Sequence, residues 1–207
     1  MATHKEDRLM VETKAGRDTL RGKPSVSLIG LLIVQMIIGY EWLLSGIAKF
    51  AAGDFASGLA DELAAKTAEA AGWYASFLNG IVVPNGIAFG YLIETAEVLA
   101  GIALIIGPLL WIFAWDRVSD RMRSTVLFLM IAAAIGGVFM ALNFHVANAG
   151  NHPWVLPDSG FDEGIDVDLV LSGIQIVIVA VQIFALNGLR RERTDVVAAT
   201  SQIKQSA

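Results

Sequence analysis

The sequence predicts an all-α membrane protein, a polytopic four-helix bundle with an amphipathic helix in its first outer loop. The first observation is composition: the 207 residues are 55% hydrophobic and only 17% charged, whereas soluble domains are about 25% charged. The second is length, because four apolar runs can each cross a hydrocarbon core of about 30 Å as a helix. The third is that most charges lie outside these runs. The four runs are Val26–Phe50, Ile87–Phe113, Thr125–Phe144 and Leu169–Leu189.

These runs divide the chain into a polar tail over residues 1–25, a transmembrane domain over 26–189 and a second tail over 190–207. Basic residues gather in both tails and in the short second connection, "WDRVSDRMR". The first outer loop carries only Lys66, and the segment from Val146 to Val167 carries no Lys or Arg. Positive charge stays inside, so we expect both termini to be cytoplasmic. Topology explains the basic patches, and no nucleic-acid partner is expected. The expected location is the cytoplasmic (inner) membrane of a bacterium or archaeon.

The two outer connections are long and differ in pattern. In the first, Ala51–Gly86, an amphipathic helix is expected to end at Gly72, because apolar and charged residues separate onto two faces. The apolar face holds Leu59, Ala60, Leu63, Ala64, Thr67 and Ala71. The second connection is rich in Gly, Pro, Asn and Asp, which predicts an irregular loop. Since both long connections are outside, a soluble partner or substrate is expected to meet the outer face.

The absence of cysteine excludes several kinds of chemistry. The chain cannot provide a thiolate nucleophile, a disulfide or cysteine ligands for an Fe–S cluster. Haem is not expected either, because His145 has no second intramembrane histidine or nearby methionine as an axial partner. His4 lies in the first tail and His152 in the second outer loop.

Polar side chains inside the predicted spans gather at one depth. Glu41, Ser45 and Lys49 fall at i, i+4 and i+8 on the first span, and Glu94 and Glu97 share a face of the second. On the third span, Asn143 shares a face with Gly136 and Ala147, while His145 points elsewhere. All these polar groups fall in the outer half of the membrane. Ionised groups there are costly unless they face protein or water, so we expect one shared polar pocket.

Structural roles explain some of these residues equally well. Glu41 and Lys49 can form an ion pair, and Glu94 and Glu97 can lock helices together through hydrogen bonds. Gln175 and Gln182 fit interhelical hydrogen bonding better than ligand binding. His145 can be an interfacial hydrogen bonder. Glycines in the spans are most simply sites of close helix packing: Gly30, Gly39, Gly46, Gly101, Gly136 and Gly137.

Three segments resemble the DoxX/DoxD-type membrane proteins, of which DoxD is the large subunit of thiosulfate:quinone oxidoreductase. "GYEWLLSGIAKF" is similar to their first-helix pattern, and "NFHVANAGNHP" to the Asn-rich end of their third helix. "ETAEVLAGIALIIGP" is similar to Glu-x-x-x-Gly-x-x-Leu-x-x-Gly in their second helix, met by Glu97, Gly101, Leu104 and Gly107. The likeness covers roughly residues 26–189. One position departs from it, since Gln35 stands where family members often carry Arg.

The resemblance implies quinone-linked redox chemistry. The first reading is therefore a membrane-embedded redox subunit that passes electrons from an outer-face donor, such as thiosulfate or a partner protein, to a quinone. Glu94 and Glu97 would be the catalytic residues that handle protons. The quinone or donor would be bound by Glu41, Ser45, Lys49, Asn143 and His145.

Two other readings stay open. The chain could be a non-catalytic accessory or assembly subunit of a larger membrane complex, with a structural polar cluster and outer loops that dock a partner. A small-solute or proton-coupled transporter is the third reading, although four helices without an internal repeat favour it less.

Overall fold

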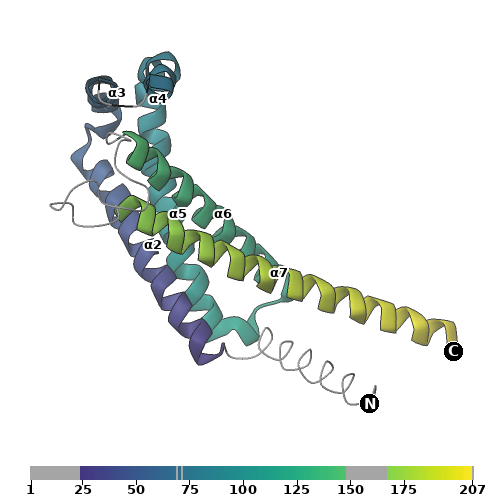
Figure 1. Ribbon diagram of the computed structural model, residues 1–207. Coiled ribbons are helices and arrows are strands. Elements are labelled where there is room, and N and C mark those ends of the chain that lie inside the picture. Colours follow the sequence, from purple (N-terminus) through teal and green to yellow (C-terminus); the bar gives the residue numbers. More distant parts are fainter. Residues whose placement is uncertain (1–23, 69, 71, 148–166, 207) are drawn as a thin grey trace, which may run out of the picture.

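The computed structural model describes residues 24–68, 70, 72–147 and 167–206. Every regular element in that part of the chain is helical, which confirms the all-α fold (Figure 1). The main helices are α2 (Val26–Ala52), α3 (Phe55–Lys66), α4 (Gly72–Phe77), α5 (Gly86–Ala114), α6 (Asp120–Ala147) and α7 (Val167–Ser206). Four of them, α2, α5, α6 and α7, are long and apolar enough to cross a bilayer. The chain is thus a multi-pass membrane bundle.

The helix ends lie within three residues of the predicted spans, except that α6 begins five residues earlier, at Asp120, and α7 continues past Leu189. Helix α2 begins after Ser25, whose Oγ accepts a hydrogen bond from the Leu28 N–H at 3.3 Å. It ends at Gly53, which adopts the left-handed conformation (φ 75°) that glycine tolerates best. Helix α7 continues to Ser206 and projects beyond the bundle (Figure 1), so the predicted C-terminal tail is largely helical. The predicted first tail and most of the second outer loop lie outside the described residues.

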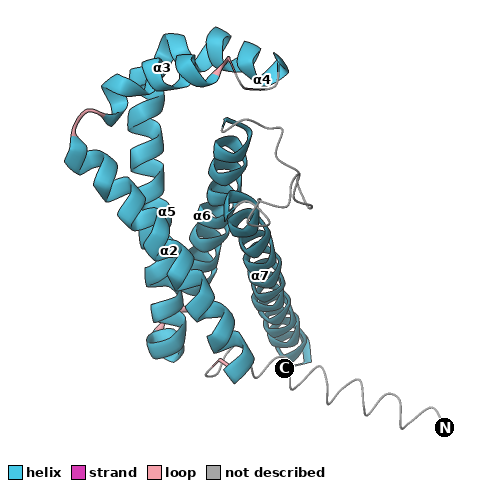
Figure 2. Ribbon diagram, turned by 60° about the vertical axis from the view of Figure 1, so that its left-hand side comes forward, coloured by secondary structure: helices cyan, strands magenta, loops and turns pink. Residues whose placement is uncertain are grey.

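The four long helices form two closely packed pairs. Helix α2 packs mainly on α5 and α6 mainly on α7, with α5 and α6 joining the pairs (Figure 2). Glycine permits the close approach of α2 to α5. A Cβ on Gly46 would lie 2.7 Å from Val98 Cγ2, and one on Gly101 would lie 2.6 Å from Leu43 N. Gly39 also packs closely, whereas Gly30 and Gly136 face open space, so the close-packing prediction is wrong at those two positions.

Helices α3 and α4 cover one end of the bundle (Figure 1). Helix α3 lies against the start of α5, where a Cβ on Gly90 would clash with Ala56. Gly72 does not end α3, as the sequence predicted, but begins α4. A π-helical turn (Leu78–Val82) and a 3-10 turn (Val83–Asn85) then connect α4 to α5. Pro84 fits at the start of the 3-10 turn, because the N–H that proline lacks would have no acceptor within the turn at that position.

Buried amides join the two helix pairs across the bundle. Gln182 Nε2 on α7 donates to Gln35 Oε1 on α2 at 2.7 Å, and Gln35 Nε2 contacts Met130 Sδ at 3.2 Å. Trp42 Nε1 donates to Gln175 Oε1 at 3.2 Å. Gln175 and Gln182 therefore make the interhelical hydrogen bonds that the sequence favoured. Gln35, at the position where the resembled family often carries Arg, is a packing residue here.

The opposite end of the bundle is closed by an arginine. Arg123 is 7% exposed, and its Nε and Nη2 donate to the backbone oxygen of Trp115 at 3.1 and 2.9 Å. Its Nη1 also pairs with Asp120 at 3.2 Å. Trp115 stacks on Trp111 with ring centroids 4.7 Å apart. This arginine therefore satisfies a carbonyl at the end of α5 and fixes the short turn into α6.

Candidate functional site

A buried ion pair joins α2 to α5. Lys49 Nζ lies 2.7 Å from Glu97 Oε2 and 3.0 Å from Oε1, and it donates to Ser45 Oγ at 2.6 Å. The Glu97 side chain is fully buried, whereas that of Lys49 is 20% exposed. The ring of Phe55, at the start of α3, lies 5.3 Å from the ammonium. Lys49 therefore has a carboxylate, a hydroxyl and an aromatic face as partners, which offset the cost of its burial.

The two remaining predicted carboxylates do not join this pair directly. Glu41 is exposed on α2, so its expected place in the bundle interior is wrong. Helix geometry accounts for this, because each i+4 step rotates the side chain by about 40°, and Lys49, unlike Glu41, forms hydrogen bonds with Glu97 on α5. Glu94 is 3% exposed, and no hydrogen bond or ion pair to it is found among the described residues.

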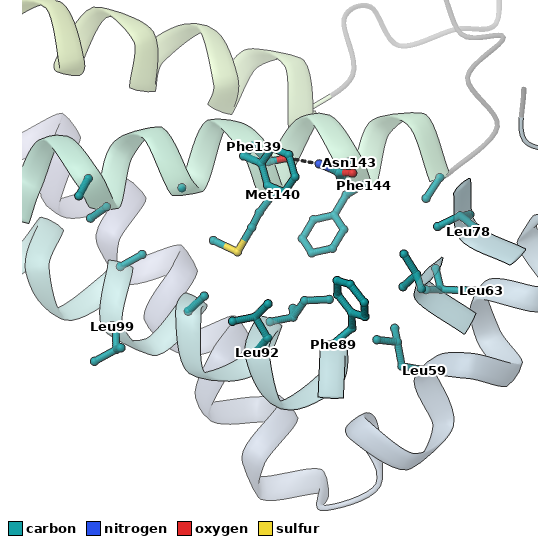
Figure 3. Close-up of a pocket in the computed structure, with 18 of the residues that line it drawn as sticks. Leu59, Leu63, Leu78, Phe89, Leu92, Leu99, Phe139, Met140, Asn143 and Phe144 are labelled. Carbon is teal, nitrogen blue, oxygen red and sulfur yellow. Dashed lines mark hydrogen bonds between the residues drawn. The ribbon is translucent and has the colours of Figure 1, made fainter. Parts of the chain in front are cut away.

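A cavity of about 520 Å³ lies between α5 and α6 (Figure 3). Neither Lys49 nor Glu97 lines it. Small residues on both helices leave the space: Ala96, Ala100 and Ala103 on α5, and Ala132, Ala133 and Gly136 on α6. Leu59 and Leu63 of α3 and Leu78 of the π-helical turn cover one end of the cavity, called the outer end here after the predicted topology. Leu92, Leu99 and Phe139 also line it and are more than 60% exposed, so the cavity opens sideways toward lipid.

The two ends of the cavity differ in polarity. Beyond the inner end, α5 and α6 meet closely, since a Cβ on Gly107 would overlap the Met130 side chain. At the outer end, the Tyr74 hydroxyl on α4 donates to Asn143 on α6, with Oδ1 at 3.1 Å and the backbone oxygen at 3.2 Å. Asn143 Nδ2 donates to Phe139 O at 2.7 Å (Figure 3). The cavity is therefore apolar along its length and polar at its outer end.

The structure divides the predicted pocket between two places. Ser45, Lys49 and Glu97 meet at the α2–α5 interface, and Asn143 lines the cavity, together with Gly136 and Ala147, as its predicted face required. His145 is 1% exposed and does not line the cavity, in agreement with its predicted direction. The single shared pocket does not form, because the Glu97 carboxylate meets Lys49 of α2, whereas Asn143 lines the cavity with Ala96 and Ala100. The functional roles predicted for these residues stay predictions.

Two features of the cavity were not expected from the sequence. Tyr74 is not among the polar residues selected from the sequence. The alanines at i, i+4 and i+7 on α5 were a visible signal of a smooth helix face, but such a face most often means close packing. Among the described residues, no group of three His, Asp or Glu side chains could hold a metal ion.

Comparison with protein-family models, with curated proteins and with solved structures finds no match to this chain. The proposed function therefore rests on the geometry and on the resemblance of the three segments.

Proposed function

We propose that the chain is a membrane-embedded, quinone-binding subunit of a redox complex. The observation that carries the proposal is the cavity of about 520 Å³ between α5 and α6, with its lateral opening and its single polar end. A lipid-soluble carrier dissolves in the bilayer and reaches such a cavity without crossing water. Pockets of this kind are mostly apolar, with a few polar groups that set orientation.

The residues fit a quinone in three ways. Phe89, Phe144 and Met140 supply aromatic and thioether surface for a planar ring. The alanines of α5 and α6 leave a smooth channel for an isoprenoid tail. Tyr74 and Asn143 offer hydrogen-bonding groups at the outer end. A bound quinone would supply the redox chemistry itself, taking up two electrons and two protons, while this chain binds and orients it away from water.

The electrons would come from a partner on the outer face. The chain has no cysteine for an Fe–S cluster, so we propose that a partner subunit carries them from a donor such as thiosulfate, in keeping with the DoxX/DoxD resemblance. Glu97 is paired with Lys49 on the side of α5 that faces α2. This favours a positioning role for Glu97 over direct proton delivery to the quinone.

Co-purification tests the proposal. The chain, purified in mild detergent with its partners, should carry quinone in its organic extract, detected by mass spectrometry. Ala133→Phe fills the cavity and should lower the bound quinone severalfold. Ala180→Phe is the matched control, because Ala180 is exposed on α7 and does not line the cavity. Equal quinone content in the two variants, or none in the wild type, contradicts the proposal.

The accessory-subunit reading is the second candidate. It is favoured by the way several polar side chains in the spans satisfy one another, as Lys49 does with Glu97 and Gln35 with Gln182. A protein that only holds a complex together needs such internal contacts and no bound ligand. A stable complex that contains partner proteins but no bound small molecule would favour this function.

A further inference from the structure

The polar end of the cavity carries no charge. Of the described residues that line the cavity, only Tyr74 and Asn143 have side-chain nitrogen or oxygen atoms, and both side chains are neutral. The nearby cation Lys49 is paired with Glu97, and neither residue lines the cavity. Because a buried charge needs a partner, a phosphate or carboxylate head group would be poorly accommodated here. The cavity therefore selects for a neutral head group.

Tyr74 is held firmly at this end. It is 5% exposed and packs with Leu78, Val82 and Ala147. The rings of Trp73 and Phe77 lie 5.4 and 5.8 Å from its own. A phenol fixed in this way presents its hydroxyl in one place, and little conformational entropy is lost when it binds a ligand.

The hydrogen bonds at this end leave donors for a ligand. The Tyr74 hydroxyl has one hydrogen, shared between two Asn143 oxygens at 3.1 and 3.2 Å, which is long for an O–H···O bond. The Asn143 amide has two N–H groups, and one of them is used by Phe139 O at 2.7 Å. The second N–H has no partner among the described residues. A ligand that accepts hydrogen bonds can accept one from this N–H. It can also accept one from the Tyr74 hydroxyl, in place of the long hydrogen bonds to Asn143.

We propose that Tyr74 and Asn143 form the head-group site of the cavity and select a neutral, carbonyl-bearing ring. The proposal rests on the function proposed above and adds the ligand's polarity and direction. The carbonyl oxygen accepts from Asn143 Nδ2 and the Tyr74 hydroxyl, at the outer end. The tail runs inward past Ala100 and Ala133 and leaves toward lipid near Leu99. The ring then lies near the outer surface, where a partner could reach it.

Binding of two matched probes to the purified full chain in nanodiscs tests this proposal. Decylubiquinone has the carbonyl ring, whereas decylbenzene has the same tail and a ring without carbonyls. Tyr74→Phe should weaken decylubiquinone binding about tenfold, the effect of one lost hydrogen bond, and leave decylbenzene binding unchanged. Tyr91→Phe is the matched control, because Tyr91 is 58% exposed and lies outside the cavity. Asn143→Asp, which keeps the size but loses the donor and adds charge, should weaken decylubiquinone at least as much.

The possible results separate the two proposals. If the wild type binds neither probe, the quinone-binding function fails and the head-group site fails with it. If the wild type binds decylubiquinone and both Tyr74→Phe and Asn143→Asp bind it equally well, only the head-group site is wrong. Displacement of decylubiquinone by palmitate at lower concentration than by decylbenzene would show that the site prefers an anion, and it would overturn the proposed neutrality. Circular dichroism and size-exclusion profiles matching the wild type show that each variant is folded.

Discussion

Lys49 on α2 reaches across to Glu97 on α5, with Nζ 2.7 Å from Oε2. The two residues are 48 positions apart in the chain, yet each supplies the charge that the other needs in a low-dielectric setting. This contact explains why a membrane-spanning segment can carry an amine. The same helix also carries Ala96, Ala100 and Ala103, which line the cavity.

Breaking this pair should destabilise the bundle. Lys49→Met leaves the Glu97 carboxylate buried without a cation, and the expected cost is about 3 kcal/mol, since removing one partner of a buried pair costs roughly 3–5 kcal/mol and Lys49 is partly exposed. Unfolding in mixed micelles measures it. Lys66→Met is the control: Lys66 pairs with Glu62 at 3.5 Å on the surface of α3, where such a pair contributes at most about 1 kcal/mol. If the two variants are equally stable, Lys49 only extends its ammonium to the outer surface.

Replacement by alanine should destabilise the protein at one glycine of α2 and not at another. Gly46→Ala places a methyl group 2.7 Å from Val98 Cγ2 and 2.8 Å from Val98 N, so α2 and α5 must separate, at an expected cost of about 1–3 kcal/mol. Gly30→Ala meets nothing within 4 Å, and alanine's higher helix propensity should make it neutral or stabilising by up to about 1 kcal/mol. Thermal unfolding of the two variants tests this. A stabilised Gly46→Ala variant would show that the α2–α5 contact is looser than described.

Topology can be tested directly. The basic residues of both tails and of the second connection favour cytoplasmic termini. Reporter fusions after residues 23 and 190 should therefore both report an inside location, and a fusion between residues 53 and 55 should report an outside one. An outside reading at either terminus is incompatible with four spans in the expected orientation.

The fold was predictable because hydrophobic length alone defines it. The predicted Ile87–Phe113 run became α5, Gly86–Ala114, with its ends displaced by one residue. The boundary at Gly72 was misplaced because glycine can end one helix or begin the next, and the local sequence does not distinguish the two. Glu41, Ser45 and Lys49 were predicted to face the interior together, and this was wrong for Glu41, because residues at i, i+4 and i+8 rotate progressively around the helix. Lys49 lies against Glu97, another residue of the predicted pocket, with Nζ 2.7 Å from Oε2.

The cavity was not predictable in the same way. Ala96 and Ala100 form a smooth face whether a neighbouring helix fills it or not. Gly107 shows one outcome, since Met130 packs directly on it, and Gly136 shows the other, since nothing lies within 4 Å of its would-be Cβ. The two glycines differ in how close the neighbouring helix comes. That distance depends on tertiary packing, which the local sequence pattern does not specify.

Glu97→Gln separates a positioning role for Glu97 from a proton-carrying one. Glutamine keeps the shape but cannot titrate, and it leaves Lys49 without a counter-charge, so we expect a loss of stability of about 1–3 kcal/mol. Since the ion pair lies outside the cavity, quinone binding at saturating ligand should be retained, and the pH dependence of electron transfer in the intact complex should match the wild type between about pH 5 and 8. The measurement is the electron-transfer rate against pH, normalised to bound quinone. A folded variant that binds quinone yet loses electron transfer would instead assign proton handling to Glu97, and a path from Lys49 to the cavity would then have to open during turnover.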